Sequence, residues 1–176
     1  MNTRTMLSAA TVIAVAQAAG AQQFFEGYDV VYDKAPFADW MLEANQDRIT
    51  DNVWITRADT KGIFNIAQEA SYTGSGTVGN SPLDTEWAFG NAVNFVSLTF
   101  TTWAVAAGGN PGFNLVGQDM VVHLITDDMY FDIRFTNWGG GDGGGGRVRY
   151  ERAAIPAPAT PALLGLGALI CTRRRR

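Results

Sequence analysis

The chain has 176 residues, of which 17 are acidic and 13 are basic, and its single cysteine excludes an intramolecular disulfide. Five of the basic residues stand near the two ends, at Arg4 and Arg173 to Arg176, whereas all 17 acidic residues lie between positions 22 and 153. This central segment therefore holds 17 acidic against 8 basic residues, a formal charge of −9. Such a balance repels polyanions, so it excludes nucleic acid as a partner.

Residues 1–21 have the three-part layout of a secretory signal peptide. Arg4 supplies a positive charge, an apolar stretch expected to be helical runs from Met6 to Ala16, and Ala19-Gly20-Ala21 form an A-x-A cleavage site. Cleavage after Ala18 is the alternative. We therefore expect export by the Sec pathway and a mature chain that begins at Gln22.

The first half of the body predicts short strands separated by loops. Aromatic and β-branched residues favour strands at Phe24–Tyr32 and Asp51–Arg57, and we expect a third strand at Gly62–Tyr72. Residues Ala35–Asn45 contain a proline and are expected to form a loop over an edge of the core. The segment Thr73–Pro82 is rich in Gly, Ser, Thr and Asn, which indicates a second loop.

In the second half of the body, the strand predictions rest on residues that alternate between the two faces of a strand. The clearest period of two in the first two-thirds of the chain predicts a strand at Phe95–Trp103. Met120–Thr126 and Tyr130–Trp138 are predicted to form a hairpin around an Asp127-Asp128 turn. After a glycine-rich run, Arg147–Arg152 is expected to be the final strand.

Short strands at spacings of roughly ten residues, with Gly, Pro and Asn in the turns and no convincing long helix, indicate an all-β fold. We expect residues 22–153 to form an antiparallel β-sandwich, jelly-roll-like and without disulfides. An N-terminal signal helix and a short C-terminal hydrophobic helix are expected to flank this domain.

The last 22 residues, IPAPATPALLGLGALICTRRRR, differ from the body in composition. They begin with prolines, continue with an apolar run, and end in four arginines. At about 1.5 Å per helical residue, the apolar run after Pro161 covers roughly half of the ~30 Å core of a bilayer. This length suits a transient membrane handle better than a permanent span, and the arginines mark its cytoplasmic side.

The residues PAPAT, then ALLGLG, then the arginine block resemble a PEP-CTERM sorting signal, with Ala157 where the motif has Glu. The resemblance implies that residues 154–176 associate transiently with the inner membrane and are removed by a membrane protease of the exosortase type. It also implies a destination in the cell envelope, at the cell surface or in the extracellular matrix of a bacterium. The residues that correspond to the sorting motif are Pro156, Pro158, Arg173, Arg174, Arg175 and Arg176.

A second resemblance concerns the body. The stretch LVGQDMVVHLITDDMYFDIRFTNWGGGDGGGG, residues 115–146, resembles a segment of exported bacterial proteins of uncharacterised function. It supports the hairpin followed by a glycine loop and implies no activity.

Few residues suit catalysis. Glu86 stands two residues after Asp84 and beside Trp87, and paired carboxylates near an aromatic ring suit glycoside hydrolysis. Strict alternation places the sole histidine, His123, on the same face of its strand as Val121 and Ile125, which favours a core or edge role over a catalytic one. The sequence contains no nucleophile elbow, zinc-ligand cluster, phosphate loop or dinucleotide fingerprint.

Three acidic residues are candidates for a calcium site. Asp127, Asp128 and Asp142 lie in turn or loop sequences, and Ca²⁺ takes carboxylate and backbone oxygens from loops. Their spacing matches no EF-hand, and an Asp-Asp pair is also good turn chemistry. Apart from this ion we expect no cofactor.

Five tryptophans are many for a chain of this length. Exposed aromatic rings on a β-sheet stack on sugar rings, although a buried core role is the alternative for each. We single out Trp87, Trp103 and Trp138 as candidates. The sequence thus predicts an exported, non-enzymatic protein that contacts exopolysaccharide. The alternatives are a secreted hydrolase that uses Glu86 with a second carboxylate, and a structural matrix protein without a ligand.

Overall fold

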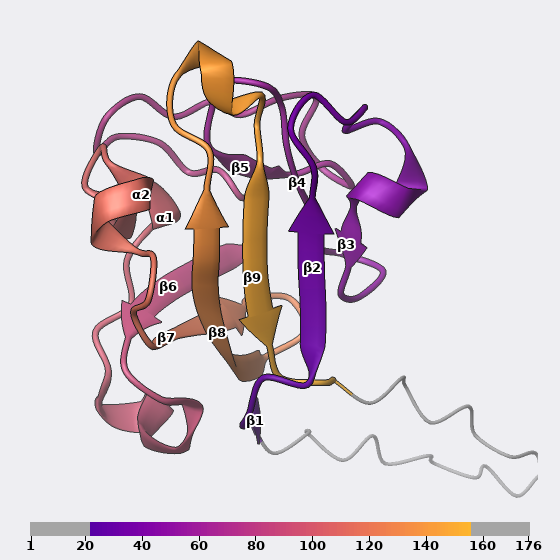
Figure 1. Ribbon diagram of the computed structural model, residues 1–176. Helices are drawn as coiled ribbons and strands as arrows, with labels where there is room; N and C mark the ends of the chain where they lie inside the picture. Colours follow the sequence, from indigo (N-terminus) through magenta and orange to yellow (C-terminus); the bar gives the residue numbers. More distant parts are fainter. Residues whose placement is uncertain (1–21, 156–176) are drawn as a thin grey trace, which may run out of the picture.

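The computed structural model describes residues 22–155, which form two β-sheets and several short helical segments (Figure 1). The expected signal peptide, residues 1–21, and the sorting motif from Pro156 onward lie outside the described residues. Within residues 22–155, every helix is too short or too polar to cross a membrane.

The large sheet has the strand order β2-β9-β8-β7-β6, and each of these neighbours is antiparallel. From β6 to β9 the strands follow one another up and down, and β2 is added at the edge of β9. The short β1 runs parallel to the beginning of β8. The bounds are Gln23–Phe25 for β1, Val30–Lys34 for β2, Thr85–Phe89 for β6, Met120–Leu124 for β7, Met129–Trp138 for β8 and Val148–Arg152 for β9.

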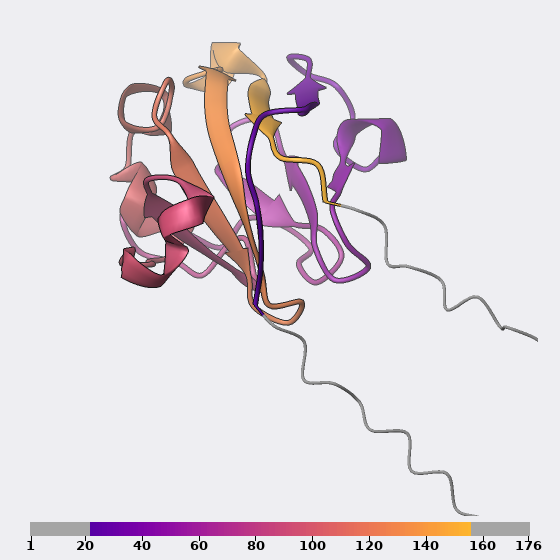
Figure 2. The same cartoon turned by 90° about the horizontal axis from the view of Figure 1, so that it is seen from below.

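The small sheet is an antiparallel meander beside one face of the large sheet (Figures 1 and 2). Its strands are β3 at Asp47–Arg48, β4 at Trp54–Arg57 and β5 at Ile63–Asn65. The helical segments are η1 at Glu43–Asn45, η2 at Ala92–Ser97, α1 at Trp103–Ala107, α2 at Pro111–Asn114 and η3 at Asp142–Gly144.

One hydrophobic core joins the two sheets. Ile55 and Ile63 of the small sheet belong to the same buried cluster as Leu124, Phe131 and Phe135 of the large sheet. Alternation on β8 and β9 places one row of side chains in this cluster, which is why their sequences have a period of two.

A buried ion pair also connects the sheets. Asp47 of β3 accepts hydrogen bonds from Nε and Nη2 of Arg152 on β9, both at 2.8 Å, and from the Tyr150 hydroxyl at 2.8 Å. Burial, reinforced by the charge of Asp47, raises the pKa of Tyr150 well above its ordinary value, so this hydroxyl stays protonated and donates.

The predictions of a mostly β fold and of antiparallel pairing are confirmed. The hairpin is also confirmed, because β7 pairs with β8 from Met120 opposite Ile133 to Leu124 opposite Met129. The final strand is confirmed as β9, with Val148 and Tyr150 buried. The finer jelly-roll arrangement stays a prediction.

The strand predicted at Phe95–Trp103 is wrong. The chain forms η2, then an irregular segment, and then α1, whose first turn is capped by the Thr102 side chain. Phe95, Leu98 and Phe100 pack against Tyr130 on the face of the large sheet that points away from the core. Figure 2 shows η2 on the opposite side of β8 from the small sheet. The alternating apolar residues serve this covering segment instead of a ladder.

Three other predicted strands differ from the structure in extent, and the one expected at Asp51–Arg57 begins only at Trp54. Phe24–Tyr32 divides into β1 and β2 around Gly27, whose φ of 104° is a conformation that favours glycine. Gly62–Tyr72 is a strand only from Ile63 to Asn65, because Glu69 accepts a hydrogen bond from the Asn65 N–H at 2.8 Å and turns the chain. By contrast, β6 was not predicted as a strand.

Candidate functional site

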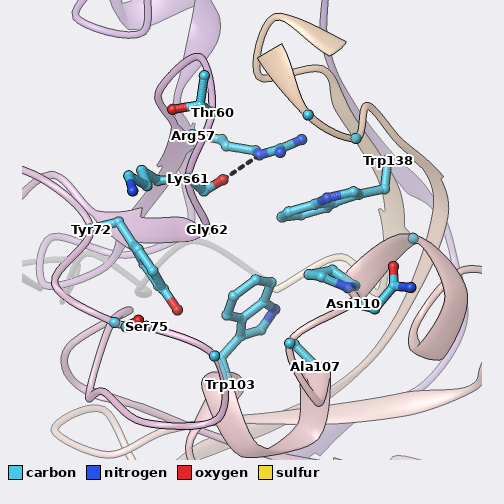
Figure 3. Close-up of a pocket in the computed structure, with 17 residues that line it drawn as sticks. Arg57, Thr60, Lys61, Gly62, Tyr72, Ser75, Trp103, Ala107, Asn110 and Trp138 are labelled. Carbon is cyan, nitrogen blue, oxygen red and sulfur yellow. Dashed lines mark hydrogen bonds between the residues drawn. The ribbon is translucent and has the colours of Figure 1, made fainter. Parts of the chain in front are cut away.

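A cavity of about 360 Å³ lies where four segments of the chain meet (Figure 3). These are the turn between β4 and β5, the loop at residues 72–76, the α1–α2 segment, and the start of the glycine loop after β8. The larger residues that line it are Arg57, Lys61, Tyr72, Trp103, Asn110 and Trp138. Backbone of several glycines completes the wall.

Three aromatic rings dominate this cavity. The ring centroids of Trp103 and Trp138 are 5.5 Å apart at an interplanar angle of 33°, and those of Tyr72 and Trp103 are 5.9 Å apart in an edge-on arrangement. Trp103 is buried at the start of α1, whereas Tyr72 and Trp138 are half-buried. The result is a corner of aromatic surface from three distant parts of the sequence.

Gly62 allows two of these rings to approach the turn between β4 and β5. A Cβ atom at this position would lie 2.5 Å from a ring carbon of Tyr72 and 2.6 Å from a ring carbon of Trp103. These distances are shorter than van der Waals contact, so any larger residue would displace the rings. Gly62 therefore shapes the aromatic corner through its missing side chain.

Arg57, the last residue of β4, forms the cationic side of the cavity. Its guanidinium carbon lies 3.7 Å from the ring centroid of Trp138, a cation–π contact. Its Nε donates to the Lys61 carbonyl and its Nη1 to the Arg147 carbonyl, both at 2.6 Å. The side chain is 2% exposed, and burial lowers the pKa of Arg57 to about 10.

Trp103 contributes an unsatisfied donor. Its Nε1 is buried and makes no hydrogen bond to any atom of residues 22–155. Figure 3 shows this nitrogen turned toward the Asn110 side of the cavity. A buried N–H without a partner loses its hydration without compensation, so a ligand oxygen that reached it after a small shift of the surrounding side chains would be stabilised.

The structure brings together two of the three tryptophans that the sequence singled out. Trp103 and Trp138 line the cavity, whereas Trp87 does not. Trp87 is 1% exposed, and its Nε1 donates to the Thr85 hydroxyl at 2.9 Å. This corrects the expectation for Trp87, because its ring belongs to the core and lines neither cavity. Trp103 also belongs to the core and is only 2% exposed, so the accessible aromatic surface of the cavity comes chiefly from Tyr72 and Trp138.

Glu86 lies elsewhere, on the outer face of the large sheet. The Glu86 carboxylate is 3.5 Å from Nδ1 of His123. The other imidazole nitrogen, Nε2, is 3.5 Å from the Asp128 carboxylate but makes no hydrogen bond to it. The imidazole stacks on the Tyr130 ring at a centroid distance of 4.1 Å. His123 is thus a packed residue at the edge of the second aromatic cluster, and Glu86 lines neither of the two cavities described here.

The calcium candidates do not meet. Asp127 accepts hydrogen bonds from the Thr50 hydroxyl at 2.6 Å and from the Asn52 amide at 2.9 Å. Asp142 follows the far end of β8, and a strand of ten residues spans about 33 Å. Asp127 and Asp128 therefore cannot share one ion with Asp142. No group of three His, Cys, Asp or Glu residues within 22–155 is arranged to hold a metal.

A second cavity, of about 540 Å³, lies near the other end of the body. Trp54 stands in its wall beneath the guanidinium of Arg48, at 4.3 Å from the ring centroid. Among residues 22–155, only one aromatic ring lines this cavity, and Asp51 and Asp127 contribute acidic groups. It therefore lacks the aromatic corner of the first cavity.

Sequence reasoning did not find Arg57, Lys61 or Tyr72. Arg57 ended a predicted strand and Tyr72 ended another, but nothing in the local sequence shows that both meet Trp138. The one available signal was the turn Thr60-Lys61-Gly62, which places a glycine beside one basic residue, Lys61. Comparison of the chain with models of protein families, with curated proteins and with solved structures finds no match.

Proposed function

We propose that the mature body is a non-enzymatic saccharide-binding module and that the aromatic cavity is its binding site. The observation that carries this proposal is the convergence of Tyr72, Trp103 and Trp138 on one cavity. The C–H faces of a sugar ring are apolar and slightly positive, so they pack on the negative faces of aromatic rings. A volume of about 360 Å³ falls within the ordinary range for small-molecule sites.

The polar groups of the cavity suit sugar hydroxyls. Asn110 offers both an amide donor and a carbonyl acceptor, and Trp103 offers a donor without a partner. A few polar groups on an apolar wall fix the orientation of a ligand and provide specificity. Neither Glu86 nor His123 belongs to this set, so we favour binding over hydrolysis.

The position of the cavity agrees with attachment or release through the C-terminal tail. Trp138 lies at the end of β8, whereas the beginning of β8 pairs with β1 at Gln23. After β9 the chain runs back toward that same end, because the Ala153 N–H donates to the Asp132 carbonyl. Figure 1 shows both ends of the described body at the lower side, away from the glycine loop. A tail that held the protein at the envelope would leave the cavity facing outward.

The binding proposal is tested by affinity electrophoresis of the purified full-length chain in gels with and without soluble polysaccharides. We expect retardation by at least one polysaccharide, and we expect Trp138→Ala to weaken it about tenfold, which corresponds to about 1.4 kcal/mol. Trp54→Ala is the matched control, because Trp54 is also half-buried beneath an arginine but lies outside the cavity. Loss of binding in Trp54→Ala alone would move the site to the second cavity.

We further propose export and exosortase-type processing, on the basis of the sequence of residues 1–21 and 154–176 alone. The intact mass of the protein recovered from its native cell envelope tests this proposal. We expect a mature N-terminus at Gln22 and loss of the arginine block. A mass that retains residues 173–176 would contradict processing at the tail.

A further inference from the structure

We infer that the saccharide is acidic and that a uronic-acid carboxylate binds on the Arg57 and Lys61 side of the aromatic cavity. This inference rests on the proposed function and names the class of saccharide that the same site takes. Three features of the cavity lead to it: the sign of the charges in its wall, the absence of a carboxylate partner for Arg57 among the described residues, and the kinds of polar group in the wall.

The wall of the cavity differs in charge from the rest of the body. Two cationic residues, Arg57 and Lys61, and no acidic residue of the described chain line it, although residues 22–153 hold 17 acidic against 8 basic residues. Asp59 and Asp142 are close in sequence to lining residues, yet neither lines the cavity. A local excess of positive charge in an acidic protein attracts an anionic group to this place.

Arg57 is a buried cation without an acidic partner. No carboxylate of residues 22–155 lies within ion-pair distance of its guanidinium, whereas Arg152, the other buried arginine, has Asp47 as its partner. The two acceptors that Arg57 has are neutral carbonyls, and its Nη2 makes no hydrogen bond among the described residues. A buried charge is stabilised by an opposite charge, and the planar guanidinium matches a carboxylate.

The remaining polar groups of the wall include both donors and hydroxyls, because Thr60, Ser75 and Tyr72 also line the cavity. Trp103 Nε1 is unpaired, Lys61 carries an exposed ammonium, and Asn110 can turn its amide toward the cavity. A neutral sugar needs acceptors as well as donors, because each hydroxyl both donates and accepts. A carboxylate only accepts, so it suits the donors of Arg57 and Lys61, whereas the hydroxyls of Thr60 and Ser75 suit the hydroxyls of the same sugar ring.

The inference is tested with two ligands that differ only in charge. An oligogalacturonate carries a carboxylate on every ring, and its methyl ester has the same rings without the charge. We expect the full-length chain to bind the acid at least tenfold more tightly than the ester, as measured by isothermal titration calorimetry. We also expect added salt to weaken binding of the acid and to leave binding of the ester nearly unchanged.

Two variants and one control locate the effect. Lys61→Gln removes a charge from an exposed side chain, so it leaves the fold intact and should weaken binding of the acid about threefold without affecting the ester. Arg57→Gln should remove most of the preference for the acid, and a thermal melt shows whether this buried variant is folded. Arg48→Gln removes an arginine that stacks on Trp54 outside the cavity, and it should change neither affinity.

Each outcome bears on one of the two proposals. Equal affinity for acid and ester, with both lost in Trp138→Ala, would overturn the acidic ligand and leave the saccharide site standing. Binding of neutral polysaccharides alone would do the same. If no acidic, esterified or neutral saccharide binds at all, the proposed function fails and the inference fails with it. A preference for the acid that Arg48→Gln removes would place the anion at the second cavity.

Discussion

Removal of the Asp47 carboxylate should destabilise the body more than removal of any surface carboxylate. Asp47 is 8% exposed and accepts two hydrogen bonds of 2.8 Å from the Arg152 guanidinium and one from the Tyr150 hydroxyl. In Asp47→Ala, Arg152 keeps only its bond from Nη1 to the Ala153 carbonyl. A buried charge and a buried hydroxyl would then lack their partner.

The expected loss is large in relation to total stability. Breaking a buried ion pair by removing one partner costs about 3–5 kcal/mol, whereas a domain is stable by about 5–15 kcal/mol. With an m value of about 2 kcal/mol per molar urea, the unfolding midpoint should fall by roughly 1.5–2.5 M. Because Asp47 belongs to the small sheet and Arg152 to the large one, the variant tests the link between the sheets.

The assay is urea unfolding followed by tryptophan fluorescence, with Asp33→Ala as the control. Asp33 also pairs with an arginine, Arg149, but at 3.3 Å and with both side chains more than one-third exposed. Exposed pairs of this kind contribute about 0–1 kcal/mol, so Asp33→Ala should shift the midpoint little. Equal midpoints for Asp47→Ala and Asp33→Ala would refute the assignment of a structural role to the buried pair.

Two further predictions concern the glycine loop at residues 139–146 and the loss of stability at acid pH. Gly146→Ala should destabilise the body by at least about 2 kcal/mol, because φ is 66° there and a Cβ would meet a neighbouring backbone carbonyl. Gly143→Ala, where a Cβ meets open space, should have little effect, and equal urea midpoints would contradict this reading of the loop. Hydrogen bonds from Tyr28 and from Arg134 lower the pKa of Asp119 in the folded protein. The ionised carboxylate therefore stabilises the fold above the unfolded pKa of about 3.9. This stabilisation is lost as the pH falls through the lower folded pKa. Asp119→Asn should therefore flatten the decline of the melting temperature below about pH 4, and an unchanged decline would show that other carboxylates cause it.

The strands that the sequence predicted best are those in which every second side chain of the strand packs into the core. In β8, Phe131, Ile133 and Phe135 all point into the core, so alternation identified the strand and its face together. In β9, Val148 and Tyr150 do the same. Each of these strands packs one face against the core between the sheets, which makes the period of two a requirement of the fold.

The same signal failed where alternating residues cover a sheet without joining it. Phe95, Leu98 and Phe100 pack on the outer face of the large sheet, while Val96 between them is 79% exposed. Because Val96 is apolar although it is exposed, the segment has the alternating sequence pattern of a strand. Only the position of Tyr130 beneath these side chains, a long-range contact, distinguishes the two cases.

The candidate site was foreseen only in part, for a similar reason. Composition drew attention to Trp103 and Trp138, and the structure places them 5.5 Å apart. The partners that give the cavity its charge and its third ring, Arg57 and Tyr72, come from the other half of the body. Their approach depends on the missing side chain of Gly62, which local sequence patterns do not reveal.

The most direct test of the saccharide site is an ¹H–¹⁵N correlation spectrum of the tryptophan indole groups during titration with oligogalacturonate. The five indole N–H signals report on five separate places in the body. We predict that the Trp103 and Trp138 signals move during the titration, whereas those of Trp40, Trp54 and Trp87 stay in place. Movement confined to Trp54, or no movement of any indole signal by this acid or by neutral oligosaccharides, would contradict a saccharide site in the aromatic cavity.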